Sequence, residues 1–373
     1  MSKKIIDLQR EATRKEKALI VGVAPSSKDR WREIDRLEEL AHLAESAGAE
    51  VFEKILQIRE KPDPSFYIGK GKAEEIRDII SEFGIDLVIF DMDLSPSQIR
   101  NLERLFKCKV VTRNELIMDI FALHARTAEA KIQVELAQLK YRLSKLIGSG
   151  KWMSRLGAGI GTRGPGQTQL EIDRQHILQR IKSLEHKLAR IERSKELQRK
   201  RRQEIFKVTL VGYTNTGKSS IMNMLTHAGV LVEDKPFATL DATTRVLHVE
   251  GLPKPVVLSD TVGFIEDLPP NLVASFHATL AVVEEADVLL HVIDITSSRL
   301  DERIEIVERT LEELKCTDRP IIRVFNKIDL LIDEAIIDRL AERYDNHVFV
   351  SARTGRNMEK LKEMIKEKLL ELS

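Results

Sequence analysis

The sequence predicts an α/β protein in which a small parallel α/β subdomain is followed by an antiparallel helical hairpin and then by a second, larger α/β domain. Three observations support this fold class. Apolar, strand-like runs alternate with amphipathic segments from residue 18 to residue 112, and the same alternation returns from residue 206 onward. Between these regions, two heptad seams flank a glycine-rich segment. We expect domains at residues 1–127, 128–204 and 205–373.

The N-terminal region is expected to contain short strands separated by helices. The predicted strands are 18–23, 51–58, 87–90 and 109–112, and the predicted helices are 29–47, 72–83 and 96–105. Gly48, directly after the first helix, suits a left-handed helix cap. Strands and helices that alternate in this way predict a small parallel sheet.

Two heptad seams predict the helical hairpin. The first seam is Ile132, Leu136, Leu139, Leu143 and Leu146, and the second is Ile177, Ile181, Leu184, Leu188 and Ile191. Residues 148–168 lie between the seams and hold seven of the 18 glycines of the chain. Two seamed helices on either side of a glycine-rich loop should fold back on each other.

The charge of the chain is unevenly distributed. Residues 140–204 carry 17 Lys and Arg against 6 Asp and Glu, although the whole chain has a net charge of only +1. A basic block in an otherwise acidic protein indicates a polyanionic partner, and the other interpretation is the solvated face of an ordinary coiled coil. The glycine-rich loop offers one stacking ring and three cations suited to unpaired RNA bases, and we expect RNA rather than DNA as the partner. These residues are Lys151, Trp152, Arg155 and Arg163.

The composition disfavours membrane and secreted proteins. No run approaches the ~18 apolar residues that a membrane-spanning helix needs. The polar N-terminus does not resemble a secretory signal. The two cysteines, Cys108 and Cys316, show no metal-ligand spacing. We therefore expect a monomeric, reduced cytoplasmic protein without stable membrane insertion.

A phosphate-binding loop is predicted directly after the strand 208–211. Residues 212–219, GYTNTGKS, fit the pattern GxxxxGK[ST]. The glycines let backbone N–H groups point at phosphate oxygens, and the helix starting near Lys218 adds its positive dipole end. Lys218 should reach the β- and γ-phosphates, and the Ser219 hydroxyl should bind Mg²⁺. A plain glycine turn is disfavoured because a strand precedes the loop and a helix follows it.

Three further motifs follow in the order that a guanine-nucleotide site requires. The first, DTVG at 260–263, offers a carboxylate for Mg²⁺ and the Gly263 N–H for the γ-phosphate. In the second, NKID at 326–329, Asp329 can accept from guanine N1–H and the 2-amino group, which rejects adenine by about 10⁴-fold. The third, Ser-Ala at 351–352, can offer a backbone N–H to guanine O6. Because each motif ends a strand, the larger α/β domain is predicted to be a P-loop (Ras-like) GTPase domain that binds GTP and GDP.

The segment VEDKPFATLDATTR (232–245) supplies the expected switch threonine. Thr239 fits that role best, with Thr243 and Thr244 as competitors. Mg²⁺ ligands are therefore expected to be Ser219, Thr239 and Asp260, and hydrolysis is expected to involve Lys218, Thr239, Asp260, Gly263 and Asn215. The full set of expected nucleotide contacts is Gly212, Tyr213, Thr214, Asn215, Thr216, Gly217, Lys218, Ser219, Ser220, Phe237, Ala238, Thr239, Asp260, Thr261, Val262, Gly263, Asn326, Lys327, Asp329, Ser351, Ala352 and Arg353.

Hydrolysis by this site is expected to be slow without a partner. Ras-like proteins orient the attacking water with a glutamine directly after DxxG, but Phe264 stands there and cannot form that hydrogen bond. Asn215 can act with a K⁺ ion on the developing charge, as the matching asparagine does in related cation-dependent GTPases. The alternative is that Asn215 is only a turn residue.

These motifs resemble the HflX family, a branch close to Obg among the translation-factor-like GTPases. The resemblance covers nearly the whole chain. It is carried by PDPSFYIGKGK (62–72), HARTAEAKIQVELAQLKYRL (124–143), GTRGPGQTQLE (161–171), VEDKPFATLDATTR (232–245) and DTVGFIEDLP (260–269). Gln167 stands where the family usually has Glu, and the chain ends one helix after Ala352, where some members have a further domain.

The resemblance implies binding to the large ribosomal subunit and its RNA, and separation of stalled ribosomes into subunits under stress. The basic block agrees with this, since phosphate neutralisation dominates non-specific RNA affinity. A GTP switch in ribosome assembly or RNA modification is the alternative, but residues 1–200 show no second catalytic domain or cofactor site. A coiled-coil scaffold without enzymatic activity is disfavoured by the complete nucleotide motifs.

Three other features have two interpretations each. His291, in the strand VLLHVID, is more consistent with a satisfied core histidine than with a catalyst. Residues 69–72, GKGK, could contact a phosphate or form a loop before a helix. Asp91 and Asp93 could bind a metal or be solvated carboxylates at a strand end.

Overall fold

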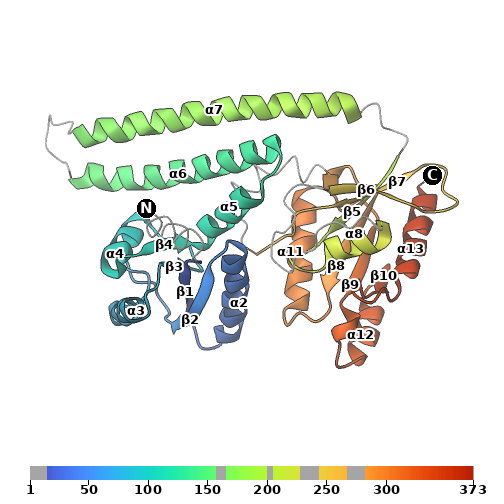
Figure 1. Ribbon diagram of the computed structural model, residues 1–373, viewed down its shortest axis with the longest axis horizontal. Coiled ribbons are helices and arrows are strands. Elements are labelled where there is room, and N and C mark those ends of the chain that lie inside the picture. Colours follow the sequence, from blue (N-terminus) through green and yellow to red (C-terminus); the bar gives the residue numbers. More distant parts are fainter. Residues whose placement is uncertain (1–14, 157–164, 200–204, 227–242, 267–281, 373) are drawn as a thin grey trace, which may run out of the picture. The chain divides into compact units, whose positions relative to one another are not determined.

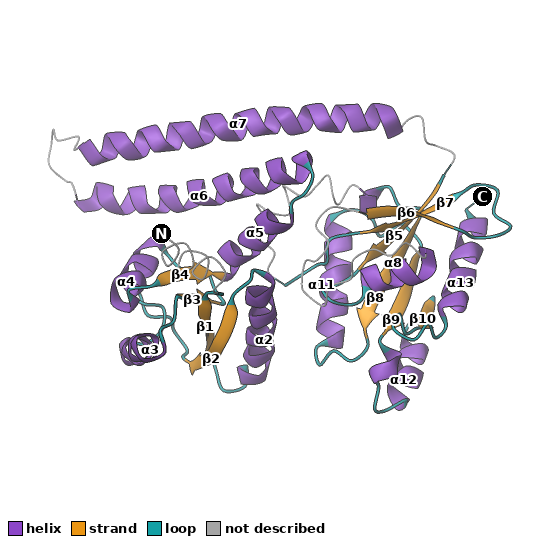
Figure 2. Ribbon diagram, viewed as in Figure 1, coloured by secondary structure: helices purple, strands orange, loops and turns teal. Residues whose placement is uncertain are grey.

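The computed structural model describes residues 15–156, 165–199, 205–226, 243–266 and 282–372. It consists of two compact units, the first made of Met1–Leu123 with Gln138–Ile181 and the second of His124–Ala137 with Lys182–Ser373. Figures 1 and 2 show that each unit contains a sheet flanked by helices. The predicted fold class is confirmed.

The sheet of the first unit is wholly parallel. Its strands are β1 (Lys17–Ala24), β2 (Glu50–Ile58), β3 (Leu87–Phe90) and β4 (Lys109–Thr112), in the order β2-β1-β3-β4. The helices are α2 (Arg30–Ser46), α3 (Lys70–Phe83), α4 (Pro96–Phe106) and α5 (Arg113–His124). The predicted strands and helices of this region agree with these bounds to within two residues.

Local sequence explains where these helices begin and end. Ser95 caps α4 by accepting from the Gln98 N–H, while the Gln98 side chain accepts from the Ser95 N–H in return. Gly84 ends α3 in the left-handed conformation, and Gly48 has a φ of +94° after α2, as its position predicted.

The sequence pattern did not predict helix α5. Five of its apolar residues, spread over more than half of its circumference, are buried, whereas Leu123 is exposed: the buried ones are Leu116, Ile117, Met118, Ile120 and Phe121. A helix that is buried on most sides has no amphipathic stripe, so the 3.6-residue period is absent.

The hairpin is formed by α6 (Ala128–Leu156) and α7 (Pro165–Arg199). Within the first unit, the part of α6 from residue 138 and the part of α7 up to residue 181 lie side by side and antiparallel (Figure 1). The expected loop at 148–168 is too long, because the helices continue through 148–156 and from 165. Gly148, Gly150 and Gly166 therefore lie in helices, although a glycine in a helix interior costs about 1 kcal/mol relative to alanine. The seam residues Leu136, Ile181, Leu184 and Leu188 are buried.

The sheet of the second unit has the order β10-β9-β8-β5-β7-β6, and β6 is antiparallel to β7 while the other pairs are parallel. The strands are β5 (Phe206–Val211), β6 (Thr243–Leu247), β7 (Val256–Asp260), β8 (Val288–Asp294), β9 (Ile321–Asn326) and β10 (His347–Phe349). The helices are α8 (Lys218–Thr226), α11 (Leu300–Glu313), the short 3₁₀ helix η1 (Ile328–Leu330), α12 (Ala335–Arg343) and α13 (Met358–Glu371). The predicted parallel strands are confirmed, and their carboxyl ends meet at one edge of the sheet.

In the described part of the chain, none of the helices has the length and apolar character that crossing a bilayer requires.

Candidate nucleotide-binding site

The loop between β5 and α8 has the backbone that a phosphate site needs. Gly212 and Gly217 have φ angles of +151° and +92°. A Cβ atom on Gly212 would lie 2.2 Å from the Val292 carbonyl oxygen, and one on Gly217 would lie 2.3 Å from Asn326 Nδ2. Only glycine fits these positions. Asn215 between them is exposed and left-handed at φ +58°, which agrees with its interpretation as a turn residue and does not test a role with K⁺.

Lys218 lies inside this loop. Its ammonium donates to the carbonyl oxygens of Gly212 and Tyr213 at 3.2 and 2.7 Å. Burial lowers the pKa of Lys218 to about 8, and the nearby Asp260 carboxylate only partly opposes that shift. A phosphate in the loop would favour the charged form. The ammonium is buried, so it can pair with a phosphate in the loop without competition from water.

A hydroxyl and a carboxylate meet at the first turn of α8. Ser219 donates its hydroxyl hydrogen to Asp260 Oδ2 at 2.5 Å, and Asp260, the last residue of β7, is fully buried. Thr261 fixes the following turn by donating to the Leu210 carbonyl at 2.7 Å. Hard oxygen atoms from a hydroxyl and a carboxylate are the ligands that Mg²⁺ prefers, so this pair fits the metal.

The DTVG turn is hydrogen-bonded to the phosphate loop. The Phe264 N–H donates to the Gly212 carbonyl at 3.0 Å, and the Thr214 N–H donates to the Phe264 carbonyl at 2.8 Å. A Cβ atom on Gly263 would lie 2.8 Å from Thr214 Cα and 2.9 Å from Lys218 Nζ. Gly263 is thus required for this close approach. The Phe264 side chain, which stands where Ras-like proteins have a water-orienting glutamine, is apolar and buried.

The residues expected to contact the guanine base lie together at the ends of β9 and β10. Asn326 is buried, and its amide donates to the Thr216 carbonyl and accepts from the Ala352 N–H, both at 2.9 Å. Asp329 is exposed and accepts from the Ser351 hydroxyl at 2.6 Å. One amide side chain therefore joins the phosphate loop to the predicted guanine-binding segment.

Some predicted site residues cannot be placed. Phe237, Ala238, Thr239 and Arg163 lie outside the described residues. Lys151, Trp152 and Arg155 lie on helix α6, where only the backbone is described.

The competitors for the switch role, Thr243 and Thr244, belong to strand β6. The Thr244 hydroxyl shares a hydrogen bond of 2.9 Å with the Ser259 hydroxyl of β7. A threonine engaged in the sheet is poorly placed to complete a metal shell.

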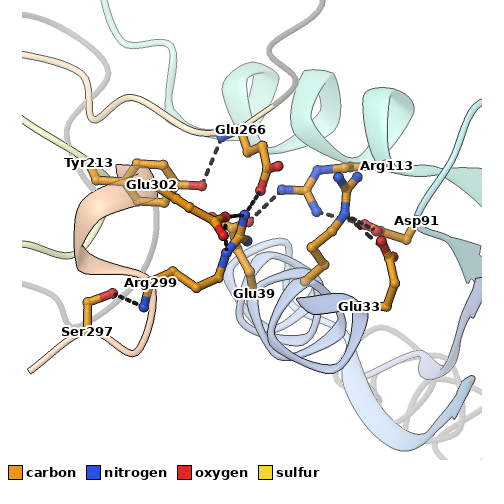
Figure 3. A network of polar contacts seen from close by, with 10 residues as sticks. Glu33, Glu39, Asp91, Arg113, Tyr213, Glu266, Ser297, Arg299 and Glu302 are labelled. Atoms are coloured by element: carbon orange, nitrogen blue, oxygen red, sulfur yellow. Dashed lines mark hydrogen bonds and ion pairs between the residues drawn. The ribbon is translucent and has the colours of Figure 1, made fainter. Parts of the chain in front are cut away.

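Sequence reasoning missed several residues near the site. Asp294, the last residue of β8, forms an ion pair of 2.7 Å with Lys327, and its position at a strand end was the available signal. Glu266 and Arg299 form a buried ion pair beside Tyr213, for which the sequence gives no local signal (Figure 3).

Of the two aspartates after β3, Asp91 is buried and Asp93 is exposed. Asp91 is buried and accepts from Arg113 at 2.7 Å and from Arg36 at 2.9 Å. Asp93 accepts from Asn114 at 2.6 Å and from Tyr141 at 3.2 Å. Groups of three or more His, Cys, Asp and Glu side chains that could hold a metal ion are absent from the residues that the structure describes.

Two other sequence features have modest roles. His291 is buried in β8, but its Nδ1 atom finds no hydrogen-bond partner within the described residues, so the expectation of a satisfied core histidine is only half right. Gly69 caps α3, and Lys72 forms an exposed ion pair with Glu75, as in an ordinary loop before a helix.

Comparison with known proteins matches three successive segments of the chain to GTPase families. Residues 34–122 match a family model described as GTP-binding GTPase N-terminal, 124–202 match GTP-binding GTPase Middle Region, and 207–327 match 50S ribosome-binding GTPase. A protein named GTPase HflX from Caldanaerobacter subterraneus subsp. tengcongensis is 46% identical over 95% of this chain and 81% of its own. GTPase HflX from Escherichia coli K12 is 45% identical over 91% and 80%.

Solved structures show the same relation. The complex of SsGBP with GDP has a TM-score of 0.53 and 28% identity, covering 96% of this chain and all of the other. A GTP-binding protein from the hyperthermophilic archaeon Sulfolobus solfataricus, also in complex with GDP, has a TM-score of 0.50 and 27% identity, with the same coverage. Both structures, each covering 96% of this chain, are thus complexes with GDP.

Proposed function

The chain belongs to the HflX family of GTPases, and on this basis we propose that it hydrolyses GTP while bound to the large ribosomal subunit and thereby separates stalled ribosomes into subunits. GTP binding and hydrolysis follow from the family. The ribosomal role is supported above all by the basic segment 140–204, which carries 17 Lys and Arg against 6 Asp and Glu. We place the protein in the cytosol as a monomer, with domains 1–127, 128–204 and 205–373.

We assign the nucleotide contacts from the geometry of the second unit. The loop 212–220 would hold the phosphates, with Lys218 on the β- and γ-phosphates. Ser219 and Asp260, together with Thr239, would hold Mg²⁺, which supplies charge neutralisation between the β- and γ-phosphates when bound. These residues would bind and orient the triphosphate, and Gly263 lies close to Lys218, since a Cβ atom on Gly263 would lie 2.9 Å from Lys218 Nζ.

The guanine base would be read at the ends of β9 and β10. Asp329 would accept from the base, Lys327 would cover its face, and the segment 351–353 would approach O6. In the structure the Ala352 N–H donates to Asn326 Oδ1. For this N–H to contact guanine, O6 of the base would have to share the hydrogen bond with Asn326 Oδ1 or replace it. The exposure of Asp329 leaves its outer oxygen accessible to the base.

Because Phe264 stands in place of a catalytic glutamine, we propose that Asn215 and a K⁺ ion assist hydrolysis instead. Asn215 lies at the exposed tip of the phosphate loop, where its side-chain oxygen can ligate K⁺ beside the β- and γ-phosphates. Replacing K⁺ by Na⁺ at constant ionic strength should then slow hydrolysis by about 10-fold or more. An unchanged rate would leave Asn215 as a turn residue only.

The hairpin provides the proposed RNA contact. Seventeen cations in 140–204 can neutralise phosphates and release counterions, so binding should weaken steeply with salt. The hairpin connection, defined as the last turns of α6 together with the segment that joins it to α7, carries the four proposed RNA contacts, Lys151, Trp152, Arg155 and Arg163. Cations at this connection would meet RNA phosphates while the Trp152 ring stacks on an unpaired base.

Co-sedimentation tests this function. The purified protein is mixed with large subunits, small subunits or whole ribosomes, in the presence of a non-hydrolysable GTP analogue or GDP. We expect binding to large subunits that is stronger with the analogue, and conversion of whole ribosomes into subunits on a sucrose gradient. Equal retention by small subunits, or intact ribosomes despite binding, would contradict the splitting role and favour a switch in ribosome assembly.

A matched set of variants separates the hairpin connection from general charge. Lys151→Ala, Arg155→Ala and Arg163→Ala together should lower the affinity for large subunits at least 10-fold and flatten its salt dependence. The control removes three exposed lysines elsewhere, Lys28, Lys70 and Lys360, and should change the affinity less than 3-fold.

A further inference from the structure

Glu266 is hydrogen-bonded to the phosphate loop through the hydroxyl of Tyr213. The Glu266 backbone N–H donates to the Tyr213 hydroxyl oxygen at 2.9 Å, and both residues are buried. Tyr213 belongs to the loop between β5 and α8, whereas Glu266 follows the DTVG turn. The side chain of one phosphate-binding element therefore holds the backbone of the other (Figure 3).

The carboxylate of Glu266 is held by the start of helix α11. Arg299 Nη2 lies 2.8 Å from Glu266 Oε2, and the two side chains are 8% and 9% exposed. Arg299 Nε also donates to Glu302 at 2.8 Å, so its guanidinium is fixed from two sides. Glu266 thus has both its backbone and its side chain anchored.

The same helix also contacts the phenol ring. The Arg303 guanidinium lies 4.8 Å from the centre of the Tyr213 ring, at cation–π distance. The N-cap and the first turn of α11 therefore supply one cation to Glu266, three residues after Gly263, and another to Tyr213 of the phosphate loop.

These contacts enclose the turn that contains Gly263. On one side, Phe264 is hydrogen-bonded to Gly212 and Thr214 of the phosphate loop. On the other side, Glu266 is anchored as described. A buried ion pair seldom stabilises a fold more than apolar residues of the same size would, but it fixes orientation. Positioning matters here, because a displacement of about 1 Å at a reacting centre can cost about 100-fold in rate.

We propose that Tyr213, Glu266 and Arg299 are positioning residues for GTP hydrolysis, which set the place of the Gly263 N–H relative to the γ-phosphate without touching it. The proposal rests on the GTPase reaction of the family and is independent of the ribosomal role. It predicts that loss of these contacts slows the hydrolysis step but leaves the affinity for GDP unchanged. GDP has no γ-phosphate that the Gly263 N–H could contact.

The test compares single-turnover GTP hydrolysis, GDP affinity and melting temperature of the full chain in the absence of ribosomes. Tyr213→Phe removes one oxygen and keeps the ring beneath Arg303, and Glu266→Gln keeps the shape of the side chain. Each variant should hydrolyse bound GTP about 10-fold more slowly, with a GDP dissociation constant within about 3-fold of the wild type. Arg299→Lys, which keeps the charge, should retain more activity than Arg299→Gln.

The matched control is Asp301→Asn. Asp301 lies in the same first turn of α11 and pairs with Arg343, but both side chains are more than half exposed. This variant should hydrolyse GTP at the wild-type rate. The proposal is overturned if Tyr213→Phe hydrolyses GTP as fast as the wild type. It is equally overturned if rate, GDP affinity and melting temperature fall together, as a purely structural role would require.

Discussion

The hydroxyl of Ser219 donates a hydrogen bond of 2.5 Å to the carboxylate of Asp260, across the gap between the first turn of α8 and the end of β7. This hydrogen bond engages Oδ2 of Asp260, a residue that is fully buried. A divalent cation between them would replace this hydrogen bond with two oxygen ligands, at the cost of little movement.

This arrangement predicts a strong effect of Asp260→Asn on Mg²⁺ dependence. The amide keeps the shape but loses the charge that attracts the ion, so hydrolysis at saturating GTP should fall by at least about 100-fold. GDP binding measured in EDTA should stay within about 3-fold of the wild type. Asp287→Asn is the control, because this carboxylate caps the opposite end of the sheet by accepting from the Lys207 N–H. A variant that keeps the wild-type response to Mg²⁺ would refute Asp260 as a ligand.

Substitution of Asp329 should change which nucleotide base the protein prefers. Its carboxylate can only accept hydrogen bonds, which suits the N1–H and amino group of guanine. Asp329→Asn adds a donor, which suits the additional carbonyl of xanthine. We expect the affinity for GDP to fall at least 100-fold and that for xanthosine diphosphate to rise, measured by competition with a fluorescent nucleotide. Unchanged preference for GDP would place base recognition elsewhere.

The parts of the fold that could be predicted from sequence are those in which one residue pattern has one structural outcome. The strand Leu87–Phe90 is buried on both faces, so it reads as a continuous apolar run. Helix α5 is also buried on most sides, but there the absence of an amphipathic stripe removes the signal. Residues 148–156 have the glycines of a loop, yet the long helix α6 continues through them.

The same distinction holds for the site. Gly212, Gly217 and Lys218 are dictated by phosphate chemistry at fixed spacing, and the structure brings them together as expected. Glu266 and Arg299 are far apart in sequence, and a charged residue is by default expected to be solvated. Their pairing depends on how α11 packs in the second unit, which no local pattern encodes.

A buried charge cluster in the first unit should be sensitive to single substitutions. Arg113 donates to Glu39 and to Asp91, both at 2.7 Å, and all three are buried (Figure 3). Arg113→Met would leave the buried Glu39 carboxylate without Arg113 and Asp91 with Arg36 as its remaining cation, and it should lower the free energy of unfolding by about 3–5 kcal/mol.

A triple variant provides the control for this cluster. Arg113→Met combined with Glu39→Leu and Asp91→Leu removes the unpaired charges, so it should be more stable than Arg113→Met alone in urea denaturation. If the triple variant is the less stable of the two, the charges themselves contribute net stability, contrary to this expectation.

His291 should make the second unit sensitive to mild acid. Burial, together with the smaller effect of the positive charges of Arg323 and Lys218, lowers the pKa of His291 to about 3. The ordinary pKa of histidine in an unfolded chain is about 6.5. Between these values the unfolded chain takes up a proton that the folded protein excludes. Stability is therefore fully present above about pH 6.5 and is lost progressively as the pH falls towards about 3.

His291→Leu should remove this contribution. The urea midpoint of the wild type should fall between pH 7.5 and pH 5.5, a range in which ordinary carboxylates stay largely ionised, and the midpoint of the variant should fall less. His42→Leu is the control, since this histidine is mostly exposed on α2 and should leave the pH dependence unchanged. Because Nδ1 of His291 lacks a partner in the described structure, the leucine side chain should also be tolerated at neutral pH. Parallel pH profiles for the wild type and His291→Leu would show that His291 gains its proton in the folded state as easily as in the unfolded chain.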